Sequence, residues 1–167
     1  MTGDKYTCHF IDIDEDARLS SCYGERVPVL MLEEQVICEG HFDADSFHVC
    51  LRQWHAQGLP LYVYSSGSVY AQKLFFANTV DGDLLPLFSS HFDTTTGSKQ
   101  EASSYEKISR ALHIDAGNIL FLSDIEAELD AAKTAGMQTC WLVREQSTSI
   151  AQARHNAVRD FYQIKFA

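Results

Sequence analysis

The residues of this sequence that could do chemistry are acids, hydroxyls, a glycine and a lysine at or soon after the ends of apolar runs. They are Asp12, Asp14, Ser65, Ser66, Gly67, Lys99, Asp124 and Glu128. Carboxylates gathered at one edge repel one another unless a cation joins them, and hard oxygen ligands of this kind suit Mg²⁺. Hydroxyls and free backbone N–H groups at the start of a helix suit a phosphate, and a lysine adds positive charge for it. The set therefore favours magnesium-assisted chemistry on a phosphate group.

The acidic stretch "FIDIDED" has two interpretations. Asp12 and Asp14 are two residues apart and so point to the same side of an extended strand. One carboxylate can then attack phosphorus to give an aspartyl-phosphate, while the other protonates the leaving oxygen and later activates water. Alternatively the stretch is an acidic surface turn, Lys99 lies in a solvated helix start, and Glu128 pairs with Lys133 or faces water. The order of these residues along successive strands favours a common site.

The elements that must position these residues can be predicted from the apolar pattern. Strands are predicted over 6–11, 59–64, 91–96, 118–124 and 138–143. Helices are predicted over 43–58, 69–79, 97–114 and 125–136, whereas 28–40 fits a helix or an extended segment equally well. Because strands alternate with helices, the expected fold class is α/β, with βαβ units around a mainly parallel sheet. In such sheets ligands bind at the carboxyl ends of the strands.

Composition and charge argue against several classes of function. The chain has 167 residues, 46% of them hydrophobic and 22% charged, as is typical of one globular domain. A formal net charge of −10 disfavours nucleic-acid and anionic-membrane partners, which need local lysine and arginine. No apolar run approaches the roughly 20 residues of a membrane helix. The five cysteines form no CxxC pair, so a reducing, cytoplasmic location is expected.

Three long segments resemble a known family. They are "LRQWHAQGLPLYVYSSGSVYAQKLFF", "GDLLPLFSSHFDTTTGSKQEASSYEKI" and "ILFLSDIEAELDAAKTAGMQTCWLVRE", with a weaker echo in "VRDFYQI". They are similar to the haloacid dehalogenase-like phosphohydrolases and, more narrowly, to the enolase-phosphatases of methionine salvage. The resemblance implies a Rossmann-like three-layer sandwich. It also implies Mg²⁺-dependent removal of phosphate from a small diketo phosphate ester, 2,3-diketo-5-methylthiopentyl-1-phosphate, after enolisation.

The resemblance also assigns catalytic and metal-binding roles to three acids. Asp12 would be the nucleophile and a magnesium ligand, and Asp14 would be the acid/base residue that offers its backbone carbonyl to Mg²⁺. Asp124 would be a further magnesium ligand.

Roles in binding the phosphate fall on the remaining residues of the set. The resemblance places Ser65, Ser66 and Gly67 against phosphate or substrate. Lys99 would be the phosphate-side lysine with a catalytic role, and Glu128 would support that lysine or the metal from behind.

The sequence departs from the family pattern in two places. Glu15 and Asp16 stand where the first motif has Gly and Thr. Only residues 17–42 occupy the interval that holds a helical cap domain in enolase-phosphatases. We therefore predict one core domain over 1–167, with 17–42 as a short remnant in place of the cap. The open site would be covered by a homo-oligomeric neighbour or would accept a larger substrate such as a phosphoprotein.

Two other interpretations remain at this stage. One is a non-catalytic member of the same family that keeps the fold, Ser65, Lys99 and Asp124 and binds a ligand without turnover. The other is an acidic phospho-receiver domain, which also gathers acids and a lysine at strand ends. A receiver needs a phospho-accepting Asp after a middle strand, where "LYVYSSGS" offers serine instead.

Overall fold

The computed structural model describes residues 16–23, 29–32, 35–39, 44–79, 81–143, 150 and 153–166. Its helices are α1 (Ala17–Tyr23), α2 (Ala44–Ala56), α3 (Val69–Ala77), α4 (Ala102–Leu112) and α5 (Glu126–Thr134). Its strands are β1 (Val29–Leu32), β2 (Gln35–Glu39), β3 (Leu61–Tyr64), β4 (Phe88–Phe92), β5 (Leu120–Ser123), β6 (Gln138–Leu142) and β7 (Asn156–Val158). Three short 3-10 helices are η2 (Leu85–Leu87), η3 (Ala116–Asn118) and η4 (Phe161–Gln163). The strand predicted over 6–11 and the acids Asp12 and Asp14 lie outside the described residues.

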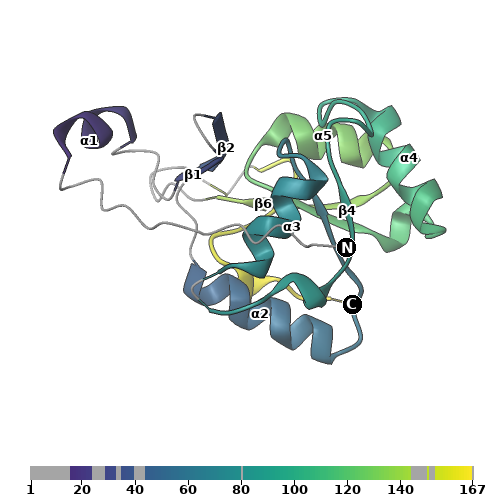
Figure 1. Cartoon of the computed structure of the whole chain (residues 1–167). Coiled ribbons are helices and arrows are strands. Elements are labelled where there is room, and N and C mark those ends of the chain that lie inside the picture. Colours follow the sequence, from purple (N-terminus) through teal and green to yellow (C-terminus); the bar gives the residue numbers. More distant parts are fainter. Residues whose placement is uncertain are drawn as a thin grey trace, which may run out of the picture.

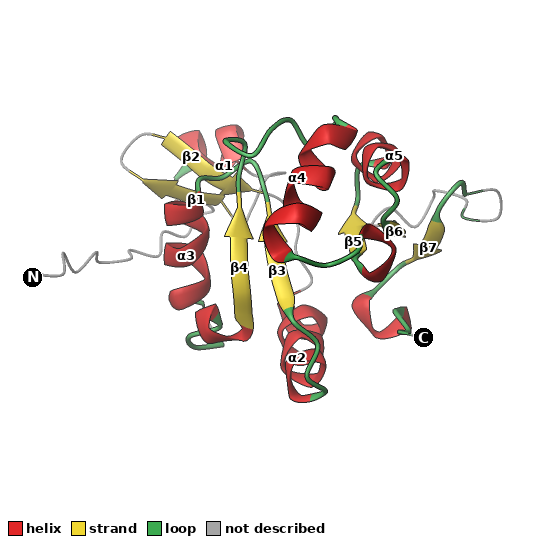
Figure 2. Ribbon diagram, turned by 90° about the vertical axis from the view of Figure 1, so that its right-hand side faces the viewer, coloured by secondary structure: helices red, strands yellow, loops and turns green. Residues whose placement is uncertain are grey.

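The strands that carry the core are parallel. β3 pairs with β4, placing Tyr64 opposite Phe92. β5, β6 and β7 form a second parallel group in that order, with Leu120 opposite Gln138. Figure 2 shows β3 and β4 side by side, and β5, β6 and β7 grouped next to them. Parallel strands joined through helices confirm the predicted α/β class.

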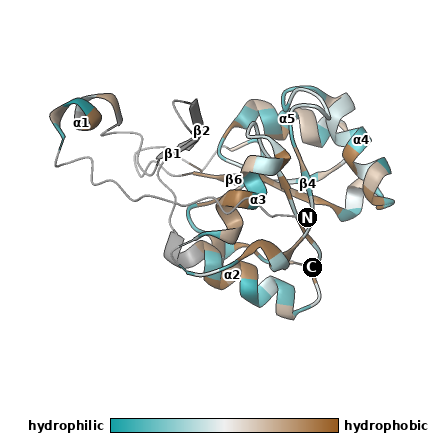
Figure 3. Cartoon of the chain, in the orientation of Figure 1, coloured by the Kyte–Doolittle hydropathy of each residue, from teal (hydrophilic) through white to brown (hydrophobic). Residues whose placement is uncertain are grey.

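One face of the strands packs on a large apolar cluster that includes α2. Leu51 and Trp54 of α2 are buried there, together with Cys140 of β6. Leu61 and Leu122, from β3 and β5, pack against the same cluster. The helix forms with this face inward because its apolar residues recur at helical spacing. In Figure 3, α2 carries both hydrophobic and hydrophilic segments, as expected for a helix between core and water.

The opposite face packs on α4 and α5. Tyr105 and Ala132 are fully buried in this second cluster, and Tyr64 and Phe121 of the strands contact it. Alternate strand residues therefore point to opposite faces, as the two-residue period of a strand requires. Figure 1 shows α4 and α5 on one side of the strands and α2 on the other. The arrangement is the predicted three-layer sandwich.

All four predicted helices are present with shifted ends, and the one predicted over 69–79 is α3. The helix predicted over 43–58 is α2, and Gly58 after it has a positive φ of 79°. The helix predicted over 125–136 is α5, followed by Gly136 at φ 90°. Glycine adopts positive φ at little cost, which explains why the chain can leave the helix direction after α2 and after α5. The helix predicted over 97–114 begins only at Ala102, because the preceding residues form a loop.

The strand predicted over 91–96 is misplaced. The strand β4 runs over Phe88–Phe92, and the chain turns directly after it. Asp93 causes the turn, because its carboxylate accepts hydrogen bonds from the backbone N–H and the hydroxyl of Thr95. An Asp side chain that bonds to the backbone two residues on competes with strand pairing. β-branched threonines at 94–96 gave a strand signal that the Asx turn overrides.

The ambiguous segment 28–40 contains β1 and β2, which pair in an antiparallel hairpin. Earlier in the chain, Asp16 lies at the start of α1. Its carboxylate accepts hydrogen bonds from the backbone N–H groups of Arg18 at 2.8 Å and Leu19 at 3.3 Å. Asp16 thus caps a short helix. The role of 17–42 as a cap remnant stays a prediction.

The C-terminal elements β7 and η4 were not predicted. β7 extends the second parallel group, and its Val158 is buried. Within the described ranges, no helix has the length and apolar character needed to cross a membrane.

Candidate active site at the carboxyl ends of the strands

The candidate site is built from loops that follow β3, β4 and β5. Ser65–Gly67 comes after β3, the loop with Lys99 comes after β4, and Asp124 follows β5 at the start of α5. Parallel strands bring their carboxyl ends to one edge, which is where ligands bind in open α/β sheets.

An ion pair between Lys99 and Glu128 lies at the centre of this edge. The Lys99 Nζ is 2.7 Å from Glu128 Oε1, and the Glu128 residue is only 4% exposed. The Ser123 hydroxyl donates to the other carboxylate oxygen, Glu128 Oε2, at 2.9 Å. Ser123 in turn accepts from the backbone N–H of Ile125 at 3.1 Å. Both oxygens of a buried carboxylate are therefore satisfied, and the lysine is held in one position.

Two tyrosines, the buried Tyr105 and the half-buried Tyr64, hold the loop that carries Lys99. The Tyr105 hydroxyl donates to the Lys99 carbonyl at 2.6 Å, and the Tyr64 hydroxyl donates to the Gly97 carbonyl at 2.9 Å. The two rings pack edge to face, with centroids 5.6 Å apart. Burial raises the pKa of the Tyr105 hydroxyl strongly, and the nearby Glu128 carboxylate raises it further. Tyr105 therefore remains a hydrogen-bond donor across the physiological pH range.

Gly97 allows this loop to approach α4. Its φ is +151°, which L side chains rarely adopt, and a Cβ there would collide with the hydroxyl oxygen of Ser104. Ser104 is fully buried. A glycine at this position is thus required for the close packing that places Lys99.

Asp93 fixes the start of the same loop and was missed by sequence reasoning. It is buried, and its carboxylate accepts from the Val69 backbone N–H at 2.9 Å as well as from Thr95. The hydroxyl of Thr95 lowers the pKa of the Asp93 carboxyl, as do the backbone N–H groups of Val69 and Thr95. Asp93 therefore joins the loop after β4 to the first turn of α3. The Asp-x-Thr pattern directly after an apolar run was the signal that could have found it.

The loop after β3 is tied to β4 by Gln72. The Gln72 side-chain amide donates to the carbonyls of Gly67 and Phe92, both at 2.8 Å. Ser65 donates its backbone N–H to the same Phe92 carbonyl at 3.2 Å. Ser66 is exposed at the tip of this loop. Among the described residues, the Ser66 hydroxyl forms no hydrogen bond with a backbone group.

A cavity of about 470 Å³ opens in front of the ion pair. It is lined by Ser66, Thr94, Gly97, Ser98, Lys99, Gln100 and Glu128. Of the predicted site residues, the structure thus brings Ser66, Lys99 and Glu128 to one cavity. Ser65 and Gly67 flank Ser66 along the chain without lining it.

Asp124 is exposed at the end of β5 and does not line the cavity. Its backbone carbonyl accepts a hydrogen bond from the Trp141 indole at 3.2 Å. Among the residues that the structure describes, no three histidines, cysteines or acids gather as they would to bind a metal. The Asp124 carboxylate would be a hard oxygen ligand suited to Mg²⁺. The other predicted ligands, the Asp12 carboxylate and the Asp14 backbone carbonyl, lie outside the described residues.

Comparison with known proteins finds enolase-phosphatases that are similar to this chain. The enolase-phosphatase E1 of Methylococcus capsulatus is 48% identical over 151 residues, which cover 86% of this chain and 62% of that protein. The enolase-phosphatase E1 of Alcanivorax borkumensis is 54% identical over 117 residues, covering 70% and 51%. No family model matches the chain. The chain spans about half to three-fifths of the length of these relatives.

Solved structures show the same fold. The UTR4 protein of Saccharomyces cerevisiae superposes with a TM-score of 0.58 at 31% identity, covering 67% of this chain and 54% of that one. The L-2-haloacid dehalogenase RSc1362 gives the same TM-score of 0.58 at 21% identity, covering 88% and 58%. The chain therefore has the fold of the haloacid dehalogenase-like structures, and in sequence it is similar to the enolase-phosphatases, as its three long segments predicted.

Proposed function

We propose that this chain is a Mg²⁺-dependent phosphatase that hydrolyses a phosphate monoester through an aspartyl-phosphate on Asp12. Asp14 would protonate the leaving oxygen and later activate water. Asp12, the Asp14 carbonyl and Asp124 would hold the metal. When bound, Mg²⁺ would neutralise the negative charge of the phosphate and of the carboxylates around it.

The observation that carries the proposal is the Lys99–Glu128 ion pair beside Ser66. Lys99 lines a cavity, and two contacts fix its position. Its Nζ lies 2.7 Å from the buried Glu128 carboxylate, and its backbone carbonyl accepts a hydrogen bond from Tyr105. A lysine that only extends into solvent does not need a buried carboxylate and a tyrosine to hold it in place. A positioned ammonium with an adjacent hydroxyl is suited to the oxygens of a phosphate. Enolase-phosphatase relatives at about half identity support the same chemistry.

The substrate class that we propose is a small diketo phosphate ester of methionine salvage, as the relatives' activity suggests. The cavity of about 470 Å³ lies within the roughly 300–1,000 Å³ range of small-ligand sites. We further propose that a second copy of the chain covers the open side of this cavity. Both proposals concern a chain that spans only part of the length of its relatives.

The test is phosphate release from p-nitrophenyl phosphate and from the diketo phosphate ester, with and without Mg²⁺. Asp12→Asn removes the nucleophile and keeps its shape, and Lys99→Gln removes the cavity cation. Asp115→Asn is the matched control, because Asp115 is exposed and its side chain caps no backbone N–H. We expect Mg²⁺-dependent release that is lost in Asp12→Asn, falls at least about a hundredfold in Lys99→Gln and is unchanged in Asp115→Asn.

Retained release in Asp12→Asn would contradict the assigned nucleophile. If the folded natural chain releases no phosphate from either ester, the proposed activity is wrong. The chain would then be a non-catalytic member of its superfamily. Circular dichroism of each variant separates these outcomes from loss of folding.

A further inference from the structure

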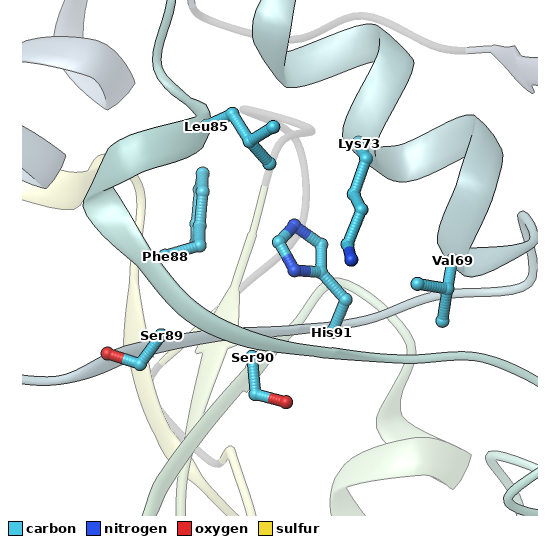
Figure 4. A pocket seen from close by; sticks show the side chains of 7 residues that line it. All are labelled: Val69, Lys73, Leu85, Phe88, Ser89, Ser90 and His91. Carbon is cyan, nitrogen blue, oxygen red and sulfur yellow. The ribbon is translucent and has the colours of Figure 1, made fainter. Parts of the chain in front are cut away.

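A second cavity lies beside α3 and β4, and it shares no lining residue with the candidate active site. Its volume is about 350 Å³, within the roughly 300–1,000 Å³ range of small-ligand sites. Figure 4 shows its two nitrogen-bearing side chains, Lys73 and His91, on the same side of β4. Nothing in the proposed phosphatase mechanism uses either residue. The cavity therefore needs an explanation of its own.

Lys73 is an exposed cation that has no anionic partner among the described residues. It lies on α3 and lines the cavity, and within the described part of the chain no carboxylate pairs with it. The chain as a whole carries a formal net charge of −10, so acidic side chains are not scarce. A lone ammonium at the wall of a cavity is a site for an external anion.

His91 places a half-buried imidazole in the wall of the same cavity. Its Nε2 is buried and has no hydrogen-bond partner among the described residues. Burial lowers the pKa of the His91 imidazole, and the positive charge of Lys73 lowers it further, so the ring is neutral near pH 7.

The remaining walls of the cavity are apolar on one side and backbone on the other. Val69, Leu85 and Phe88 supply the apolar surface. In the described part of the chain β4 pairs only with β3, and the Phe92 carbonyl points toward β3 because it accepts from Ser65. Strand residues alternate in direction, so the backbone groups of His91 face the unpaired edge. A ligand here meets a cation, an imidazole and an apolar wall together.

We propose that this cavity binds a small organic anion, a carboxylate with a short apolar chain. The carboxylate would lie beside the His91 imidazole and accept a hydrogen bond from the Lys73 ammonium. The apolar chain would contact Val69, Leu85 and Phe88. Both charge and chain are required, because the cation alone is partly solvated and the apolar wall alone is small. The site does not depend on phosphatase activity.

The experiment follows the His91 imidazole resonances by NMR while sodium hexanoate is added to the full chain. Acetate carries the charge without the chain, and 1-hexanol carries the chain without the charge. We expect hexanoate to give a saturable shift at His91 and to bind about tenfold or more tightly than either comparison compound. That factor corresponds to about one charge-assisted hydrogen bond or two buried methylene groups.

Two pairs of variants locate the site. Lys73→Met should weaken hexanoate binding about tenfold, whereas Lys165→Met should leave it unchanged, because Lys165 is an exposed lysine that does not line the cavity. Binding to His91→Phe, followed by calorimetry, should also be weaker, with His55→Phe as its control. The absence of a saturable shift at His91, or equal affinity for hexanol, would overturn the proposal. Equal binding by Lys73→Met and the natural chain would overturn it as well.

Discussion

At the scale of single residues, the site depends on a lysine and a glutamate that stabilise one another. The Glu128 side chain is 6% exposed and that of Lys99 is 19% exposed, so neither charge is fully solvated. We predict that Lys99→Met lowers the free energy of unfolding by roughly 3 kcal/mol, because it leaves a buried carboxylate without its cation. Urea denaturation followed by fluorescence of the two tryptophans measures this change.

The double variant Lys99→Met/Glu128→Gln is the control for that interpretation. Glutamine removes the charge and still accepts a hydrogen bond from Ser123 through its amide oxygen. The double variant should therefore be more stable than Lys99→Met alone. If both variants lose the same stability, the cost does not come from an uncompensated buried charge.

Asp93 links stability to pH. Its pKa in the folded chain is lowered by hydrogen bonds from Thr95 and Val69. The stability that this ionised carboxylate contributes is complete above its pKa in the unfolded chain, about 3.9, and is lost as pH falls through the lower folded value. We predict that Asp93→Asn is destabilised by about 1–3 kcal/mol at pH 7 and that its deficit shrinks toward pH 3.

Urea denaturation of Asp93→Asn and the natural chain across this pH range measures the difference. Asp83→Asn is the control, because Asp83 is exposed and accepts one backbone hydrogen bond, from Leu85. A deficit for Asp93→Asn that stays constant down to pH 3 would contradict the role of its charge.

At the scale of elements, the sequence predicted helices and strands that follow from a periodic apolar pattern. It missed element ends that depend on the hydrogen bonds of a single side chain. α2 was predictable, because Leu51 and Trp54 lie three residues apart on a face that is buried throughout. β4 was misplaced because the turn depends on the Asp93 carboxylate, which no periodic pattern reveals. β7 was missed because three residues that join the end of a sheet carry too short an apolar signal.

The loop between β4 and α4 is the element on which the lysine position depends. We predict that Gly97→Ala destabilises the chain by more than 2 kcal/mol, since the new Cβ meets the Ser104 hydroxyl and the backbone φ of +151° is strained. Gly97→Ala/Ser104→Ala removes the colliding oxygen and should recover part of the loss. The backbone strain should remain in the double variant.

Urea denaturation of both variants measures the recovery. Gly82→Ala is the matched control for strain alone, because Gly82 also has a positive φ, of 90°, and a Cβ there meets nothing within 4 Å. A loss in Gly97→Ala no larger than that of Gly82→Ala would show that the contact with Ser104 is not limiting.

The candidate site itself was predictable in part. Ser66, Lys99 and Glu128 share a cavity, as their order along successive strands predicted. The direct pairing of Lys99 with Glu128 required knowing how the loop after β4 lies relative to α5, which is a tertiary contact. The supports from Tyr64 and Tyr105 were hidden, because aromatic residues at core spacing give only a packing signal.

At the scale of the whole molecule, the last described residues close the apolar cluster around α2. Phe161 packs on Phe47 at a ring-centroid distance of 4.9 Å and on Trp54 at 6.3 Å, and Ile164 is buried in the same cluster. Segments more than a hundred residues apart in sequence therefore form one core. Such contacts contribute to global stability and not to the site directly, which lies at the carboxyl ends of the strands.

We predict that Phe161→Ala lowers the free energy of unfolding by about 2–4 kcal/mol, because it removes a half-buried ring from this cluster and leaves a cavity. Its neighbour gives the matched control, since Tyr162 is 58% exposed and Tyr162→Ala should change stability by less than about 0.5 kcal/mol. Urea denaturation measures both, and the fluorescence of Trp54 reports the loss of the adjacent ring. Equal effects of the two substitutions would mean that the C-terminal segment does not pack on α2 in solution. The Lys99–Glu128 pair lies at the carboxyl ends of the strands and not in this cluster, so Phe161→Ala combined with Lys99→Met should lose stability additively.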